Sequence, residues 1–90
     1  LKSINIKGSG QSLLSMLILS NTPLKRLPEG IGELKNLRVL DVSDNDLRSL
    51  DFELIEGLEK LLYLWVGGNQ IPEEDLALIQ KKCKRVSLKV

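Results

Sequence analysis

The sequence predicts an α/β solenoid, in which short repeats stack side by side and build one parallel sheet. One apolar pattern occurs three times, starting at Leu14, Leu37 and Leu61, so that the starts lie 23 and 24 residues apart. Within each copy, apolar residues recur two positions apart, so that their side chains share one face of a short strand. A single copy cannot bury its apolar face, so we expect the copies to stack.

The bulk composition fits one small domain. Of the 90 residues, 42% are hydrophobic and 28% are charged, and 13 basic against 12 acidic residues leave a net charge of +1. We therefore expect no nucleic-acid partner and no membrane partner, since surfaces for either usually carry a clear basic excess. No apolar run approaches the roughly 18 residues of a membrane span.

Two features of the chain bear on its context. Cys83 is the single cysteine and cannot form an internal disulfide. Small extracellular domains usually carry several disulfides, so we expect a reducing, cytoplasmic location. The sequence begins at Leu1 instead of Met, which favours a fragment or a processed form of a longer protein.

The three copies share the template L-x-x-L-x-L-x-x-N-x-L. They cover Leu14–Leu24, Leu37–Leu47 and Leu61–Ile71. A segment of the form L-P-x-x-I-G-x-L separates the first two copies, at residues 27–34. This pattern resembles that of the leucine-rich repeat family.

The resemblance implies an arc of parallel strands that are joined by variable crossovers, and a role in binding other proteins on the concave face. It also implies that Asn45 and Asn69, at the ninth template position, bond the backbone of neighbouring turns. Thr22 replaces Asn in the first copy, so we expect fewer bonds in that turn.

The repeats divide the chain into one domain of 90 residues. Residues 1–13 are interpreted as an N-terminal strand and turn, residues 14–36, 37–60 and 61–82 as repeats, and residues 83–90 as a capping strand. The last assignment places Cys83, Val86 and Leu88 at template positions one, four and six. About five short parallel strands are expected: Ile4–Ile6, Leu17–Leu19, Leu40–Val42, Leu64–Val66 and Val86–Leu88.

A helix is predicted over residues 73–82. Pro72 suits a first helical position. Acidic residues 73–75 suit the positive end of the helix dipole, and Lys81 and Lys82 suit the negative end. Leu76, Ile79 and Cys83 then share one face. This helix and the final strand are expected to cap the C-terminal end of the core and to shield an open sheet edge.

The residue types that carry chemistry are sparse, and we expect no catalytic residue, metal or cofactor. The chain has no His. Asp41, Asp44 and Asp46 do not match the ligand spacing of a calcium loop. The glycine pairs lack the Lys and Ser/Thr of a phosphate loop. Basic neighbours could activate the Cys83 thiol, but its repeat position favours a buried core side chain.

A candidate partner-binding site follows from the strand alternation. Template positions three, five and seven face away from the core, and they include Tyr63 and Trp65, two of the three aromatic residues of the chain. Aromatic residues are enriched at interface hot spots. The predicted partner-binding residues are Met16, Ile18, Val39, Asp41, Tyr63, Trp65 and Arg85.

The expected roles differ within this set. Tyr63 and Trp65 would be anchors in an apolar surround, while Asp41 and Arg85 would orient the partner. Lys7, Asp41, Arg85 and Lys89 would form a polar rim, and Gly67 and Gly68 would leave open space beside the patch.

Two other functions remain open at this stage. The chain could be the substrate-recognition segment of a larger repeat-containing enzyme, such as a ligase or a kinase. It could also be a structural piece that self-associates through its concave face or an open edge.

Overall fold

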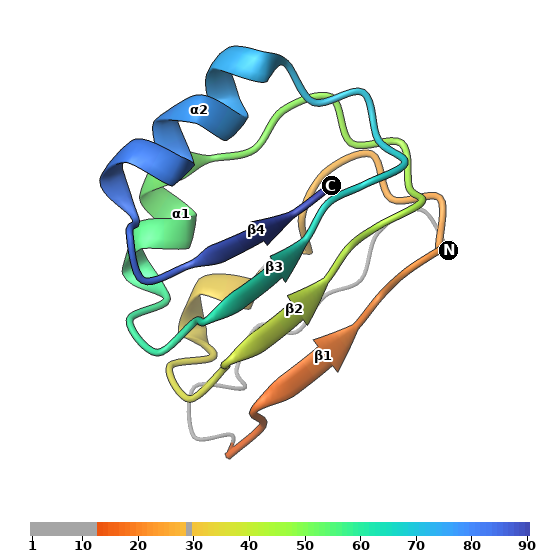
Figure 1. Ribbon diagram of the computed structural model, residues 1–90. Helices are drawn as coiled ribbons and strands as arrows, with labels where there is room; N and C mark the ends of the chain where they lie inside the picture. The colour runs from red at the N-terminus through yellow and green to blue at the C-terminus, as the bar shows by residue number, and fades with distance from the viewer. Residues whose placement is uncertain (1–12, 29) are drawn as a thin grey trace.

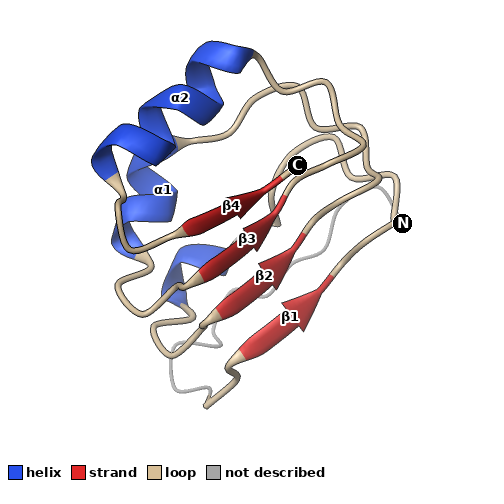
Figure 2. Ribbon diagram, in the orientation of Figure 1, coloured by secondary structure: helices blue, strands red, loops and turns tan. Residues whose placement is uncertain are grey.

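The computed structural model describes residues 13–28 and 30–90. The elements run in the order β1 (Met16–Ile18), η1 (Ile31–Glu33), β2 (Val39–Asp41), α1 (Phe52–Gly57), β3 (Tyr63–Trp65), α2 (Glu73–Lys82) and β4 (Ser87–Lys89). The strands lie side by side on one side of the molecule, and the helices lie on the other (Figures 1 and 2). The predicted α/β solenoid is confirmed.

The sheet is parallel, with the strand order β1-β2-β3-β4. Leu17 pairs with Leu40, Leu40 with Leu64, and Leu64 with Leu88. The described residues therefore hold four strands, and the fifth predicted strand, Ile4–Ile6, lies outside them. Strands β1 to β3 begin one residue before their predicted starts, and β4 begins one residue after its predicted start.

The apolar core fills the space between the sheet and the crossovers. Leu40 and Leu64 point into it from the strands and are fully buried. Leu37 and Leu61, at the first template position, are also fully buried, as is Ile55 of α1. These side chains belong to one contiguous cluster that extends from Leu24 to Val86. The repeats share this core, as stacking of incomplete units requires.

The side chain of Asn45 bonds the turns of two repeats together. Its Oδ1 accepts from the backbone N–H groups of Thr22, at 2.8 Å, and Leu24, at 3.0 Å. Its Nδ2 donates to the carbonyl oxygens of Leu19 and Val42, both at 2.9 Å. The predicted role of this Asn is confirmed.

Asn69 repeats the arrangement one turn later. Its Oδ1 accepts from the N–H of Leu47 at 3.0 Å, and its Nδ2 donates to the carbonyl oxygens of Val42 and Val66. In the first copy, the Thr22 hydroxyl donates to the Leu19 carbonyl at 2.7 Å. Within the described residues, the Thr22 side chain makes fewer hydrogen bonds than that of Asn45 or Asn69, in line with the expectation, and Asn45 Oδ1 supplies the acceptor for the Thr22 and Leu24 N–H groups.

The eighth template position has a left-handed backbone in all three copies. The φ angles are 55° at Asn21, 56° at Asp44 and 75° at Gly68. Asn, Asp and Gly are the residue types that tolerate this conformation best. The sequence thus places a suitable residue directly before the ninth template position of each copy, where the chain turns away from the strand.

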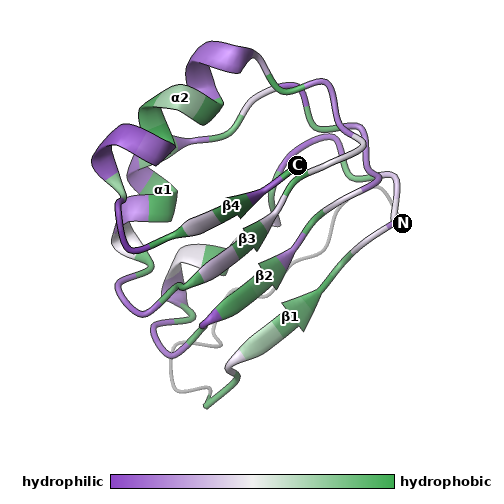
Figure 3. Cartoon of the chain, viewed as in Figure 1, coloured by the Kyte–Doolittle hydropathy of each residue, from purple (hydrophilic) through white to green (hydrophobic). Residues whose placement is uncertain are grey.

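Helix α2 has the predicted bounds, Glu73–Lys82, although Pro72 is its N-cap residue and not its first helical residue. Figure 3 shows hydrophilic residues at both ends of α2 and hydrophobic residues in its middle. Ile79 is fully buried beneath the helix. The Asp75 carboxylate accepts from the N–H of Leu50 at 3.1 Å and so ties α2 to the preceding repeat.

Candidate functional site

The side of the sheet that faces away from the helices is here called the open sheet face. It carries two rows of side chains, one from each of two template positions. Strand pairing gives the first row as Met16, Val39, Tyr63 and Ser87, and the second as Ile18, Asp41, Trp65 and Lys89.

Large apolar side chains on this face are exposed. The exposed fraction is 52% for Met16, 58% for Ile18, 46% for Tyr63 and 45% for Trp65. Val39 lies between Met16 and Tyr63 and is half-buried. The structure therefore brings together all five aromatic and aliphatic residues of the predicted site. Contiguous exposed apolar surface of this kind is typical of interaction sites.

The rigidity of the face comes from the core beneath it. Tyr63 and Trp65 flank Leu64, which is fully buried on the opposite side of the same strand. A shift of the strand by one residue would exchange these sides, and burial of Leu64 against the shared core opposes such a shift. The two aromatic side chains are thus presented from a fixed backbone.

Asp41 lies in the middle of the second row, with Ile18 on one side and Trp65 on the other. It is half-buried. Its Oδ1 accepts from both the backbone N–H of Ser43, at 3.0 Å, and the Ser43 hydroxyl, at 2.6 Å. These two bonds hold the carboxylate in one orientation within an otherwise apolar surround.

Arg85 does not join the other predicted site residues. Its guanidinium donates to the backbone carbonyl oxygens of Glu56, at 3.2 Å, and Leu58, at 2.7 Å. These carbonyls lie at the C-terminal end of α1, where a cation is favourable. Arg85 therefore caps the C-terminal end of α1. The prediction that it lies beside Tyr63 and orients a partner is corrected.

The error came from the register of the last copy. Cys83 was assigned to the first template position, which placed Arg85 beside Tyr63. In the structure Ser87 pairs with Tyr63, a spacing of 24 residues, so Arg85 itself stands at the first position. Lys89 consequently pairs with Trp65 and supplies the rim charge on this side. Lys7, the other predicted rim lysine, lies outside the described residues.

Gly67 and Gly68 do not leave open space beside the patch, contrary to expectation. A Cβ atom on Gly67 would lie 3.0 Å from the backbone carbonyl carbon of Val90. A Cβ atom on Gly68 would lie 3.0 Å from the backbone N and Cα of Asp44. The two glycines allow close approach of neighbouring chain segments, so their role is in packing.

The Cys83 thiol is a core group. The side chain is 1% exposed, as expected, although the corrected register places Cys83 two residues before the first template position. Burial raises the pKa of the thiol, the nearby charge of Arg85 lowers it, and that of Glu56 raises it, with burial having the largest effect. Because the thiolate is the reactive form, this environment disfavours a nucleophilic role.

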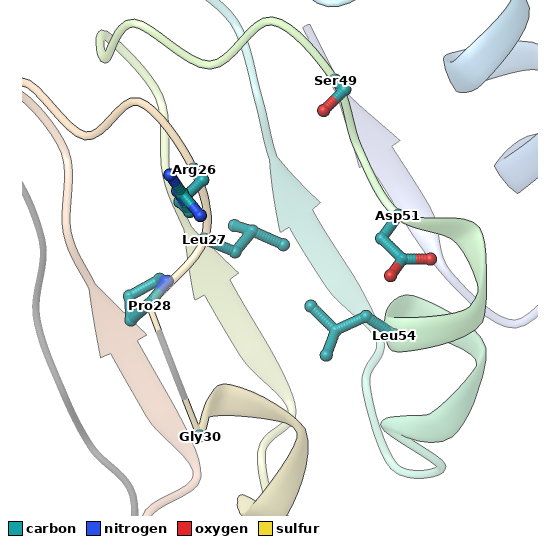
Figure 4. Close-up of a pocket in the computed structure, with 7 residues that line it drawn as sticks. All are labelled: Arg26, Leu27, Pro28, Gly30, Ser49, Asp51 and Leu54. Carbon is teal, nitrogen blue, oxygen red and sulfur yellow. The ribbon is translucent and has the colours of Figure 1, made fainter.

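A pocket between two crossovers was not predicted from the sequence. It has a volume of about 300 Å³ and is lined by Arg26, Leu27, Pro28, Gly30, Ser49, Asp51 and Leu54. Figure 4 shows Arg26, Leu27 and Pro28 on one side, with Asp51 and Leu54 on the other. Asp51 already caps α1 by accepting from the Glu53 N–H at 3.0 Å. The volume is at the lower limit for small-molecule sites.

Metal-binding clusters and membrane-spanning helices are both absent from the described residues. Among residues 13–28 and 30–90, no group of three or more His, Cys, Asp or Glu side chains is placed to hold a metal ion. No helix in the same part of the chain is long and apolar enough to cross a membrane.

Comparisons with known proteins agree with the repeat pattern. The family model described as leucine rich repeat matches residues 12–71. Mouse Vasorin is 46% identical over an alignment of 66 residues, and the match covers 68% of this chain and 10% of Vasorin. Mouse Nephrocan is 35% identical over 57 residues, which are 62% of this chain and 11% of Nephrocan. The chain therefore spans about a tenth of the length of each of these relatives.

A solved structure shows the same architecture. A leucine-rich-repeat protein of Leptospira interrogans superimposes with a TM-score of 0.77 at 29% identity. The match covers 100% of this chain and 25% of that protein. The fold found here is thus similar to one part of that longer leucine-rich-repeat protein.

Proposed function

Because this chain belongs to the leucine-rich repeat family, we propose that it binds a protein partner on the open sheet face, without catalysing a reaction itself. Tyr63 and Trp65 are the anchors of this interface. The apolar side chains of Met16, Ile18 and Val39 surround them. Asp41 and Lys89 add charges that select the orientation of the partner.

The observation that carries this proposal is the exposure of Tyr63 and Trp65 on one short strand. Neither aromatic ring is needed to fill the core, which Leu64 supplies from between them. Tyr and Trp bury a large area at a small cost in conformational entropy, and they dominate many interface hot spots. A partner that covers both rings removes apolar surface from water at a preformed site.

The size of the sheet limits the affinity that this face alone can provide. Four strands of three residues each offer about 600–800 Å² per partner, which is the lower end of standard interfaces. Affinity at this size depends on the quality of the anchors more than on area. We therefore expect a moderate affinity that rests mainly on Tyr63 and Trp65.

The test is an affinity capture from an extract of the source organism with three immobilised proteins. These are the wild type, the double variant Tyr63→Ala/Trp65→Asp, and the control Leu78→Asp. Leu78 lies on α2 and is 40% exposed, close to the 45% of Trp65, so the control adds the same charge at a similarly exposed apolar residue away from the sheet. Circular dichroism establishes that all three are folded.

We expect a specific protein to be captured by the wild type and by Leu78→Asp but not by the double variant. Equal capture by all three proteins would exclude the open sheet face as the binding site. Sedimentation of the wild type over a range of concentrations addresses the remaining alternative. A dimer that the double variant abolishes would assign the face to self-association instead.

A further inference from the structure

Asp41 has an unusual position for a carboxylate that belongs to no ion pair within the described residues. It separates the exposed side chains of Ile18 and Trp65, which pair with it from the two neighbouring strands. Parallel strands lie about 4.8 Å apart, so both apolar side chains are immediate neighbours of the carboxylate. A partner that contacts Ile18 and Trp65 together must also cover Asp41.

Only one of the two carboxylate oxygens is bonded within the described part of the chain. Oδ1 accepts both hydrogen bonds from Ser43, and no described residue donates to Oδ2. The Ser43 bonds fix the carboxylate without neutralising its charge. A further donor therefore has to come from outside this part of the chain when the face is covered.

We infer that the protein partner presents a basic side chain, preferably an arginine, to Asp41 between Ile18 and Trp65. This inference rests on the proposed function and names the chemistry of the partner. Covering an ionised carboxylate without a compensating charge is strongly unfavourable. A partner with an apolar or acidic residue at this point would bind more weakly, because it would cover the Asp41 charge without compensating it.

Trp65 favours a guanidinium over an ammonium as the partner group. The indole lies beside Asp41 on the same row of the sheet. A planar guanidinium can stack on an aromatic ring while it donates to a carboxylate. Lys89 pairs with Trp65 on its other side, so the face is acidic near β2 and basic at β4. This polarity selects a partner with the opposite arrangement of charges.

The probe is a phage library of random 12-residue peptides, selected separately on wild type, Asp41→Asn and Asp46→Asn. Asp46 is an exposed carboxylate that lies beyond the strand, which makes it a matched control. We expect basic residues to be enriched on wild type and on Asp46→Asn, and this enrichment to be lost on Asp41→Asn. Equal enrichment on all three proteins would overturn the inference.

The best peptide is then synthesised with Arg, or with its neutral analogue citrulline, at the enriched position. Truncating one member of a covered charge pair usually weakens binding by at least about 10-fold. We expect the citrulline peptide to bind wild type with this loss of affinity, and the Arg peptide to bind Asp41→Asn with the same loss. The citrulline peptide should bind Asp41→Asn with no additional loss. Independent, additive losses would show that the Arg contacts another group and would overturn the inference.

The outcome separates this inference from the proposed function. Peptides that need Tyr63 and Trp65 but show no basic preference would contradict the inference alone. Peptides that bind the Tyr63→Ala/Trp65→Asp variant as well as wild type, or a selection that yields no binding peptide, would contradict both.

Discussion

Asn45 and Leu24 are joined by a hydrogen bond of 3.0 Å that spans 21 residues of sequence, from the Leu24 N–H to the Asn45 Oδ1. Asn45 is only 5% exposed, and its amide also bonds backbone groups of Thr22, Leu19 and Val42. One side chain therefore replaces the water that these backbone groups lose when two turns stack.

The first prediction concerns this amide. Asn45→Ala leaves several backbone groups without a partner, and each buried unpaired group costs about 1–3 kcal/mol. We expect the free energy of unfolding to fall by about 3–5 kcal/mol, measured by urea denaturation. Asn69→Ala should cost less, because Asn69 accepts from a single described backbone N–H and is half-buried. An equal effect of the two substitutions would contradict the ranking.

The second prediction compares two glycines. Gly68 has a φ of 75°, and a Cβ atom there would meet the Asp44 backbone at 3.0 Å. We expect Gly68→Ala to reduce the free energy of unfolding by about 1–3 kcal/mol, because a left-handed backbone and a steric contact act together.

Gly57 is the matched control for this substitution. It ends α1, and a Cβ atom there would meet nothing within 4 Å. We expect Gly57→Ala to leave thermal stability unchanged or to raise it slightly, since Ala has the higher helix propensity. Similar losses for both variants would show that the Gly68 conformation is not the cause.

Alternation along the strands was enough to predict which side of the sheet is buried. Leu40 lies between Val39 and Asp41, and Leu64 lies between Tyr63 and Trp65, so burying both leucines turns Asp41 and the two aromatic residues to the other face. Helix α2 could also be predicted, because Pro72, the acidic first turn and the final lysines all mark its ends. The exposed pair of Tyr63 and Trp65 follows from the same alternation.

Features that depend on packing between repeats could not be predicted in this way. Helix α1 is a six-residue helix, too short to give a clear apolar period. The prediction of the β4 register was wrong because the first template position, which is Leu61 in the preceding copy, is the charged residue Arg85 in the last one. Cys83, two residues earlier, matches the apolar pattern better but does not occupy that position. The pocket beside Leu54 arises only when two variable crossovers pack together.

The cytoplasmic location stays a prediction.

The corrected role of Arg85 leads to a third prediction. Its bonds to Glu56 and Leu58 lie at the end of α1 and not on the open sheet face. We expect Arg85→Ala to lower the free energy of unfolding by about 1 kcal/mol, as for a typical hydrogen bond. Capture of the partner should be unchanged under conditions in which the variant is folded. A loss of capture without a loss of stability would restore Arg85 to the interface.

The last prediction concerns pH and Cys83. Burial raises the pKa of this thiol above its value in the unfolded chain, so the folded state holds its proton at a pH where the unfolded state has lost it. The contribution of this group to stability is then complete below the pKa of the thiol in the unfolded chain, and it is lost as the pH rises through the folded pKa.

Urea denaturation of wild type and Cys83→Ala at pH 7, 8.5 and 10 measures this effect. We expect Cys83→Ala to be the less stable protein at pH 7, since it leaves space in a packed core, and the difference between the two proteins to shrink toward pH 10. The native thiol should also react slowly with a disulfide reagent and quickly in urea, because only unfolding exposes it. A stability difference that is constant with pH, together with fast labelling of the folded protein, would show that Cys83 is accessible and that its pKa is not raised by burial.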